Sequence, residues 1–367
     1  MIDTVCDPTE RDQLELSGLF DAAWYLTENP DVQSAGLDAL SHFCRNGWRE
    51  GRRPNPYFDP GWYLDQFPDV RAAGLNPLLH YLRHGDQEGR RPIRHFDPAW
   101  YRTAYGIPPA AVTLAHFLVK RTCGLYAPSP ELWSVLHIAP YQDDATLGDD
   151  PFLHFFDDMR RDAREPFPDF DVVAASGLLD TNYYLISGAD VHAAGSEPID
   201  HFSRHGWRER RKPNLYFDTA WYLLTNPSVT RLKINPLVHY ILVGEAAGRR
   251  PVVYFDPPWY RQNHDVPSGQ SALAHFLAHR RSQTVSPTPL FDVSWYVGQH
   301  ADELGPHRDP FAHYLRAGTC HDIDPSPAFS AAAYRREHLG RPTRRFPQLM
   351  QPERDNPLVH HLRAEYR

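Results

Sequence analysis

Hydrophobic and polar positions follow a regular order along this chain, and residues 58–95 show that order most clearly. Asp59 and Pro60 predict a helix start, because an aspartate caps free backbone N–H groups and a proline loses no hydrogen bond at the first helical position. The apolar residues of this first helix are Trp62, Tyr63 and Leu64.

A second helix is predicted in the same stretch. Pro68 interrupts the first helix, and Gly74 can adopt the left-handed backbone that ends the segment. Asn76 followed by Pro77 predicts the next helix start, and Gly85 closes that helix. Its apolar residues at helical spacing are Leu78, Tyr81 and Leu82. We therefore expect a short helix pair with a turn, joined to the next stretch by a linker that contains Gly89, Arg90 and Pro92.

The same order returns along the chain at two levels. Repeats of about 38 residues carry one histidine each in the second helix, in steps of 38, 36, 38 and 47 residues, and this series of steps occurs twice. The histidines are His42, His80, His116, His154, His201, His239, His275, His313 and His360. Four repeats therefore form a block, and the block is duplicated at an offset of 159 residues.

This organisation predicts an all-α, solenoid-like array of about nine short helical repeats. The expected parts are a lead-in at 1–18, a first four-repeat half-array at 19–169, a second at 170–328, and an incomplete ninth repeat or terminal cap at 329–367. The ninth repeat could equally belong to a longer array. Because helices of about ten residues are marginal alone, stability is expected from aromatic faces that stack between repeats.

Composition narrows the function classes. The net charge of −8 argues against a general nucleic-acid binder, which needs a positive field. No apolar run is long enough for a membrane span, and the N-terminus does not resemble a cleavable signal peptide. The four cysteines have no paired spacing, so we expect free thiols in a reducing, cytoplasmic compartment.

Motifs typical of enzymes are not found, including GxxxxGK[ST], GxGxxG, HExxH, CxxC and GxSxG. We therefore expect no catalytic residue, no cofactor and no metal. Two Asp-x-Asp triplets, at 169–171 and 322–324, are expected to serve turns or helix caps. Histidines that occur once in each stacked repeat would lie about 10 Å apart, too far to share a metal ion. We expect each of them to bond a neighbouring turn.

Several recurring polar and aromatic residues are expected to be structural: Asp59, Trp62, His80, Arg90, Asp97, Asp218, Trp221, His239, Arg249 and Asp256. An arginine and an aspartate recur together around each linker, which predicts a partly buried ion pair between repeats. The expected pairs are Arg52 with Asp59, Arg90 with Asp97, Arg211 with Asp218, and Arg249 with Asp256. The competing interpretation is a ladder of arginines that faces an anionic ligand.

Residues that recur at 159 but not at 38 are candidates for binding, since requirements of the fold should recur in every repeat. Trp48-Arg49 and Trp207-Arg208 meet this criterion, and Lys120-Arg121 against His279-Arg280 is a weaker case. Tryptophan beside arginine can stack on a sugar ring and bond its hydroxyl or carboxylate groups. The alternative is that the tryptophan covers a seam between repeats.

The pattern FDPxWYLxxxPDVxxAGxNPLxHYLxxGxxEGRRPxPxFD resembles a bacterial repeat of exopolysaccharide and rhamnan-type glycan synthesis. There the repeat accompanies glycosyltransferase and sometimes sulfotransferase domains, and a related version occurs in large secreted repeat proteins. The resemblance covers residues 19–328. It implies a non-catalytic helical module in glycan assembly and supplies no catalytic residues. The glycosyltransferase domain itself is not found in this chain.

Together these observations favour a non-enzymatic scaffold or adaptor in bacterial surface-polysaccharide synthesis. Its expected partner is a protein, for example a glycosyltransferase, or an anionic oligosaccharide. One alternative is the substrate-positioning arm of a glycosyltransferase whose catalytic part follows Arg367. Another is a secreted surface or adhesion module exported without a cleaved signal peptide, against which the absence of Gly-Asp calcium-binding repeats argues.

Overall fold

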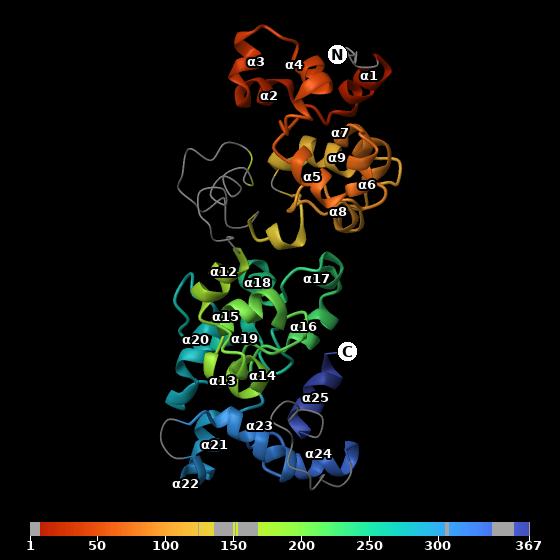
Figure 1. Cartoon of the computed structure of the whole chain (residues 1–367). Helices are drawn as coiled ribbons and strands as arrows, with labels where there is room; N and C mark the ends of the chain where they lie inside the picture. Colours follow the sequence, from red (N-terminus) through yellow and green to blue (C-terminus); the bar gives the residue numbers. More distant parts are fainter. Residues whose placement is uncertain are drawn as a thin grey trace. The chain divides into compact units, whose positions relative to one another are not determined.

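A computed structural model describes residues 8–123, 125–135, 150, 152, 168–304, 308–339 and 356–366 (Figure 1). These residues form short helices joined by turns, without a strand. The first half contains α1 (Pro8–Ser17), α2 (Ala22–Glu28), α3 (Pro30–Ser34), α4 (Ala39–His42), α5 (Pro60–Gln66), α6 (Pro68–Ala72), α7 (Pro77–His80), α8 (Pro98–Tyr105) and α9 (Thr113–Lys120). The second half contains α12 (Pro168–Ser176), α13 (Thr181–Ser187), α14 (Ala189–Ala193), α15 (Pro198–His201), α16 (Thr219–Thr225), α17 (Pro227–Leu232), α18 (Pro236–His239), α19 (Pro257–Asn263), α20 (Ala272–His279), α21 (Val293–Gln299), α22 (Ala301–Leu304), α23 (Pro310–Cys320), α24 (Ala331–His338) and α25 (Pro357–Glu365).

The all-α prediction is therefore confirmed, and a helical arrangement recurs along the chain. Repeat 58–95 begins as its sequence predicts, because Asp59 accepts a hydrogen bond from the Trp62 N–H at 3.0 Å and Pro60 is the first helical residue. Asn76 caps α7 in the same way. The predicted helix pair is wrong in one respect. Pro68 both ends α5 and starts α6, so that this repeat contains three short helices before its linker.

A π-helical turn follows the last of these helices and is not predicted by the sequence pattern. It spans Tyr81–Gly85 after α7, and the equivalent turns are Phe43–Gly47, Phe202–Gly206 and Tyr240–Gly244. A π turn widens a helix by one residue for each turn and needs a local reason. In this turn Gly85 lies against Tyr63: a Cβ added to Gly85 would collide with the hydroxyl of Tyr63, so the missing side chain leaves room for that tyrosine.

The repeat histidine bonds a tyrosine, rather than a neighbouring turn as the sequence had suggested. In each repeat whose histidine is described, Nδ1 lies 2.8–3.0 Å from the hydroxyl of a tyrosine in the first helix. The pairs are Tyr25–His42, Tyr63–His80, Tyr101–His116, Tyr184–His201, Tyr222–His239, Tyr260–His275, Tyr296–His313 and Tyr334–His360. His154 lies outside the described residues. The bond fixes the first helix of a repeat against the last.

A recurring backbone hydrogen bond closes several of the repeats on their own linkers. The N–H of Asp59 donates to the carbonyl of Pro92 at 3.1 Å. The same bond joins Asp21 to Pro54, Asp97 to Pro128, Asp180 to Pro213, Asp218 to Pro251 and Asp292 to Pro325. Since the aspartate opens a repeat and the proline ends it, the two ends of the repeat lie together.

The core of each repeat is aromatic. In repeat 58–95, Phe58, Tyr63 and Tyr81 are fully buried, and their ring centroids lie 5.4–6.2 Å apart. Tilted and edge-on pairs at this separation are favourable beyond the area that they bury. These short helices are therefore held by aromatic packing.

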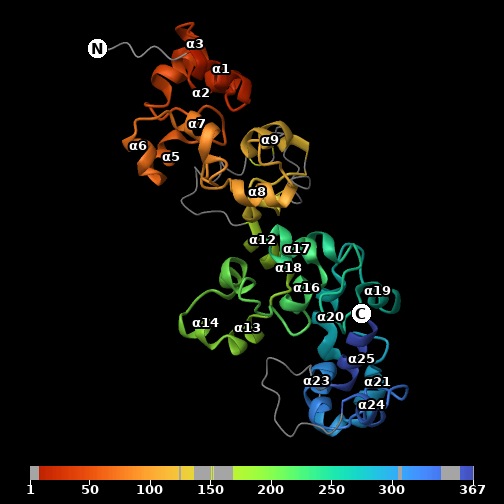
Figure 2. The same cartoon turned by 90° about the vertical axis from the view of Figure 1, so that its right-hand side faces the viewer.

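The chain divides into two compact units. The first comprises Met1–Pro168 with Arg231–Lys233, and the second comprises Asp169–Thr230 with Ile234–Arg367. In the second unit, Figures 1 and 2 show α23, α24 and α25 together near the C-terminal end. The longest helix of the described residues, α23, has 11 residues and falls well short of a membrane span, which needs about 20.

The predicted arginine–aspartate pairs are wrong by one position. The neighbouring basic residue makes each pair, as Arg91 does with Asp97 at 2.7 Å and Lys212 with Asp218 at 2.8 Å. Arg53–Asp59 and Arg250–Asp256 complete the set. The arginines named from the sequence turn back into their own repeats. Arg52 binds Asp31, Arg90 binds Asp69, Arg211 binds Asp190 and Arg249 binds Asn226.

Candidate functional site

The two tryptophans singled out as binding candidates lie in the core. Trp48 is 8% exposed and Trp207 is 7% exposed, and their indole N–H groups donate to the carbonyls of Cys44 and Ser203 at 3.1 Å. The guanidinium carbons of Arg49 and Arg208 lie 4.2 and 4.4 Å from the indole centroids. A sugar that stacked on either indole from the same side would have to displace this arginine.

These tryptophans occupy the position six residues after the repeat histidine, which joins two repeats where it is acidic. We call it the junction position. In repeat 58–95 it is Asp86, whose buried carboxylate accepts from the Thr113 N–H at the start of α9 in the next repeat, at 3.0 Å. Glu245 accepts from the Ala272 N–H at the start of α20 in the same way, at 2.6 Å. Tyr366 occupies the junction position of the ninth repeat.

The basic candidates near the end of the third and seventh repeats are internal counterions, with one exception. Arg121 lies 2.8 Å from the buried Asp150, and Arg280 lies 2.9 Å from Asp180 and 3.3 Å from Asp309. Lys120 is exposed at the end of α9. Arg121 and Arg280 are therefore committed to carboxylates of their own unit.

A tyrosine completes each of these buried clusters. Tyr57 donates to Asp150 and Tyr216 to Asp309, both at 2.7 Å. Burial raises the pKa of both Asp150 and Asp309, because the charged carboxylate loses its hydration. Each cluster ties residues from three repeats of one block, and we assign it to the fold.

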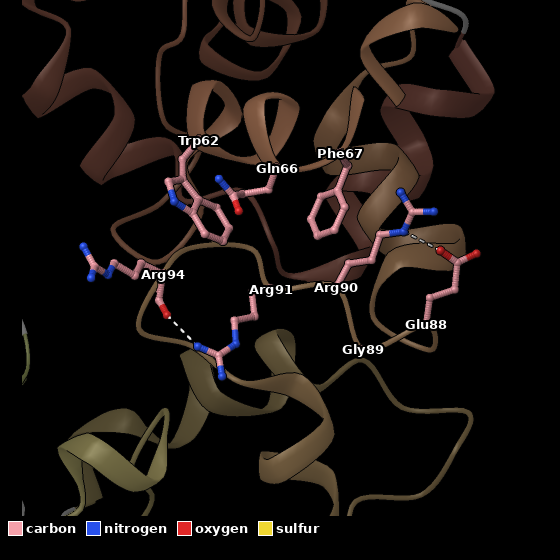
Figure 3. Close-up of a pocket in the computed structure, with 8 residues that line it drawn as sticks. All are labelled: Trp62, Gln66, Phe67, Glu88, Gly89, Arg90, Arg91 and Arg94. Carbon is pink, nitrogen blue, oxygen red and sulfur yellow. Dashed lines mark hydrogen bonds and ion pairs between the residues drawn. The ribbon is translucent and has the colours of Figure 1, made fainter. Parts of the chain in front are cut away.

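A shallow pocket of about 380 Å³ opens between α5 and the linker of repeat 58–95 (Figure 3). Trp62, Gln66 and Phe67 come from one side, and three arginines of the linker lie across from them. The complete lining is Trp62, Gln66, Phe67, Glu88, Gly89, Arg90, Arg91 and Arg94. This arrangement, which we call the Trp62 cleft, combines aromatic faces with planar cations.

Two of the arginines in the Trp62 cleft are held in place by carboxylates. Arg90 bonds Asp69 at 2.8 Å and Glu88 at 2.6 Å, and its guanidinium carbon lies 4.9 Å from the Phe67 centroid. Arg91 donates to Asp97 at 2.7 Å and to the carbonyl of Arg94 at 3.1 Å. Their charges are thus largely balanced, while the planes of both guanidinium groups are fixed. A fixed plane suits the stacking of a flat ring.

The equivalent cleft of the second block is occupied by the chain itself. Tyr366, one residue after α25, packs on Trp221 with ring centroids 5.2 Å apart. The guanidinium carbon of Arg250 lies 5.4 Å from the Tyr366 centroid. Trp221 and Arg250 are the counterparts of Trp62 and Arg91 at the offset of 159.

Sequence reasoning assigned Trp62 and Arg90 to structure and did not select the rest of the Trp62 cleft. The search asked which residues the two blocks share, whereas much of this lining differs between them. Gln66, Glu88 and Arg94 are replaced by Thr225, Ala247 and Val253. Arg94 is exposed, whereas Val253 is 1% exposed. A search for divergence between the blocks would have found the cleft.

The Asp-x-Asp triplets have structural surroundings. Asp322 bonds Arg335 at 2.8 Å, and Asp324 accepts from the Ala331 N–H at the start of α24, at 2.7 Å. Asp169 and Asp171 lie in the first turn of α12. Across the described ranges, no three His, Cys, Asp or Glu side chains gather closely enough to hold a metal ion.

Comparison with family models, with curated proteins and with solved structures yields no match for this chain.

Proposed function

We propose that this chain is a non-enzymatic helical-repeat scaffold that binds a partner protein in bacterial surface-polysaccharide synthesis. The observation that carries the proposal is the use of the polar side chains. The histidines, tyrosines, aspartates and arginines that recur in the repeats are partners of one another, as in the Tyr63–His80 bond and the Arg91–Asp97 pair. Polar side chains that bond one another in this way maintain the shape of the helical surface.

The Trp62 cleft supports a binding role for that surface. It is shallow and aromatic, and it lies on a linker between two repeats. Stacked repeats commonly present such extended surfaces to other proteins. Aromatic residues and arginine are also the side chains that contribute most to protein interfaces. The setting in glycan synthesis rests on the resemblance of the repeat pattern.

A capture experiment with matched variants tests the scaffold function. The tagged full chain, its Trp62→Ala and Arg94→Glu variants and a Lys120→Glu control are incubated with native extract. Mass spectrometry then identifies proteins and glycans. We expect a protein of surface-polysaccharide synthesis to be retained by the unaltered chain and by the Lys120→Glu control. Retention of an anionic oligosaccharide in place of a protein, or of neither, would contradict the proposal.

A further inference from the structure

The two equivalent clefts of this protein differ in one respect: the chain fills one of them. In the second unit, Tyr366 lies between Trp221 and Arg250, at the C-terminal end of α25. In the first unit, Trp62 and Arg91 line an open pocket. The filled cleft therefore shows what kind of group the open one can hold.

The filled cleft holds a phenol ring at the end of a helix. Tyr366 remains 45% exposed, so the cleft covers only part of the ring. Trp221 lies in α16, so its contact with Tyr366 brings the C-terminal end of α25 against α16. Tyr366 is the first residue after the last turn of α25, so its ring is presented from the C-terminal end of a helix.

Arg91 and Arg250 are held in place by equivalent hydrogen bonds. Arg91 donates to Asp97 and to the carbonyl of Arg94, and Arg250 donates to Asp256 and to the carbonyl of Val253. In the second unit this bonding leaves the guanidinium close enough to stack on Tyr366. The open cleft therefore has the same aromatic face and the same fixed cation.

We propose that the Trp62 cleft docks the C-terminal end of a helix from a partner protein, with an aromatic residue at that end. The proposal rests on the scaffold function and deepens it by naming the chemistry of the partner. The aromatic ring packs against Trp62 and Arg91, as Tyr366 packs against Trp221 and Arg250.

The differences between the clefts add a charge preference. Arg94 stands where the filled cleft has Val253, and Gln66 stands where it has Thr225. An exposed arginine at the rim favours an acidic residue in the last turn of the docked helix. Glu365 is such a residue in this chain: it is the last residue of α25 and directly precedes Tyr366. A partner helix that ends in an acidic residue followed by an aromatic one fits this surface.

A peptide with the sequence of residues 356–366, Asn-Pro-Leu-Val-His-His-Leu-Arg-Ala-Glu-Tyr, is the probe. The full-length chain is titrated with fluorescently labelled peptide, and anisotropy and calorimetry give affinity and stoichiometry. In the unaltered chain Tyr366 already fills the second cleft, so the peptide should bind once. Trp62→Ala should weaken binding by about tenfold or more, as loss of a central aromatic contact does. Arg94→Glu repeats the test on an exposed side chain, where substitution should leave the fold intact.

A second variant provides an internal standard. Tyr366→Ala removes the ring but leaves α25, whose Leu358, Val359 and Leu362 are buried, so the stoichiometry should stay at one peptide, and combining the change with Trp62→Ala should abolish binding. A peptide in which alanine replaces tyrosine should not bind. Binding to the Tyr366→Ala chain without binding to the unaltered chain would overturn the proposal.

A glycan is the alternative occupant, and the same assay excludes or reveals it. Binding of a uronic-acid trisaccharide that is lost in Trp62→Ala, in the absence of peptide binding, would assign the cleft to saccharide and overturn the proposal. The scaffold function is tested separately. A partner captured equally by the unaltered chain and by Trp62→Ala would leave the scaffold intact while refuting docking at this cleft.

Discussion

The phenol oxygen of Tyr63 lies 3.0 Å from Nδ1 of His80, and this bond joins the first and last helices of one repeat. Burial lowers the pKa of His80, because the protonated ring would lose its hydration. A neutral ring whose Nδ1 carries no proton accepts a hydrogen bond from the hydroxyl. Because this pair recurs, the same hydrogen bond holds the first and last helices together in one repeat after another.

Removing the hydroxyl should weaken the repeat without creating a large cavity. Tyr63→Phe leaves the nitrogen of His80 unpartnered, which should lower the free energy of unfolding by about 1–2 kcal/mol. Hydrogen exchange, which reports local opening, should show faster exchange in α5 and α7. Tyr222→Phe should act on α16 and α18 in the same way. Unchanged exchange in both variants would show that the bond contributes nothing.

Stability should depend on pH through the buried histidines. Burial lowers the pKa of His80, His116, His275 and His313. A histidine whose pKa is lower in the folded state stabilises the fold while it is neutral. The unfolded chain titrates near 6.5, so stability should be complete above that pH and fall as the pH drops through the folded-state values.

Thermal unfolding followed across this range measures the effect, and NMR titration of the imidazole protons assigns it to individual rings. An increase in melting temperature on acidification below the ordinary histidine pKa would contradict this prediction.

The glycine that closes the π turn should not tolerate a side chain. A Cβ on Gly85 would meet the Tyr63 hydroxyl and the Tyr81 ring, so Gly85→Ala should break the Tyr63–His80 bond or move α7. We expect a loss of about 1–3 kcal/mol in unfolding free energy. Gly61→Ala in α5 is the matched control. Its Cβ would make only an ordinary contact, 3.5 Å from Asp59, and alanine favours helix. Urea denaturation should separate the two variants.

Trp48 should prove more important for stability than for binding. Because its indole is buried and hydrogen-bonded, Trp48→Ala should cost about 3–5 kcal/mol in unfolding free energy. Arg49→Ala, which removes only the exposed stacking partner, should cost about 0.5–1 kcal/mol. A Trp48→Ala chain with an unchanged melting temperature and weakened partner binding would restore the binding role suggested by the sequence.

Arg280 should be needed to neutralise buried charge. Arg280→Met leaves Asp309 buried without its cation, which should cost about 3–5 kcal/mol in the second unit. The loss should shrink at low pH, where Asp309 can take up a proton. Lys120→Met, on an exposed side chain, should change stability by less than about 0.5 kcal/mol. Differential calorimetry at two pH values distinguishes these outcomes.

Local signals in the sequence predict the helix starts well. Asp59, Pro60 and Asn76 act within three residues of their own positions, so their effect can be read without knowing the fold. The π turn and the close approach of Gly85 to a tyrosine in another helix could not be read in this way, because they involve residues far apart in the sequence. The predicted arginine–aspartate pairs were wrong by one position for a related reason. Adjacent Arg90 and Arg91 point to different repeats, and only the tertiary structure shows which one meets Asp97.

The candidate site was harder to predict because its two copies have different surroundings. Trp62 and Trp221 occupy the same place in the repeat, and the difference arises from Tyr366, far away in the sequence. A search for repeated residues therefore identifies those that build the repeat. It misses residues that line an open cleft in one copy of the repeat and a filled cleft in the other.

The bond between Asp59 and Pro92 gives repeat 58–95 the form of a nearly closed loop with its two ends side by side, and the equivalent bonds do the same in other repeats. Polypeptide segments with adjacent ends can be inserted or removed with little displacement of what lies on either side. Recombination between similar stretches of the gene would therefore add or delete whole loops more readily than parts of them. The duplication of a four-repeat block fits such a history, and chimaeras joined at the linker prolines should fold where chimaeras joined within α5 do not.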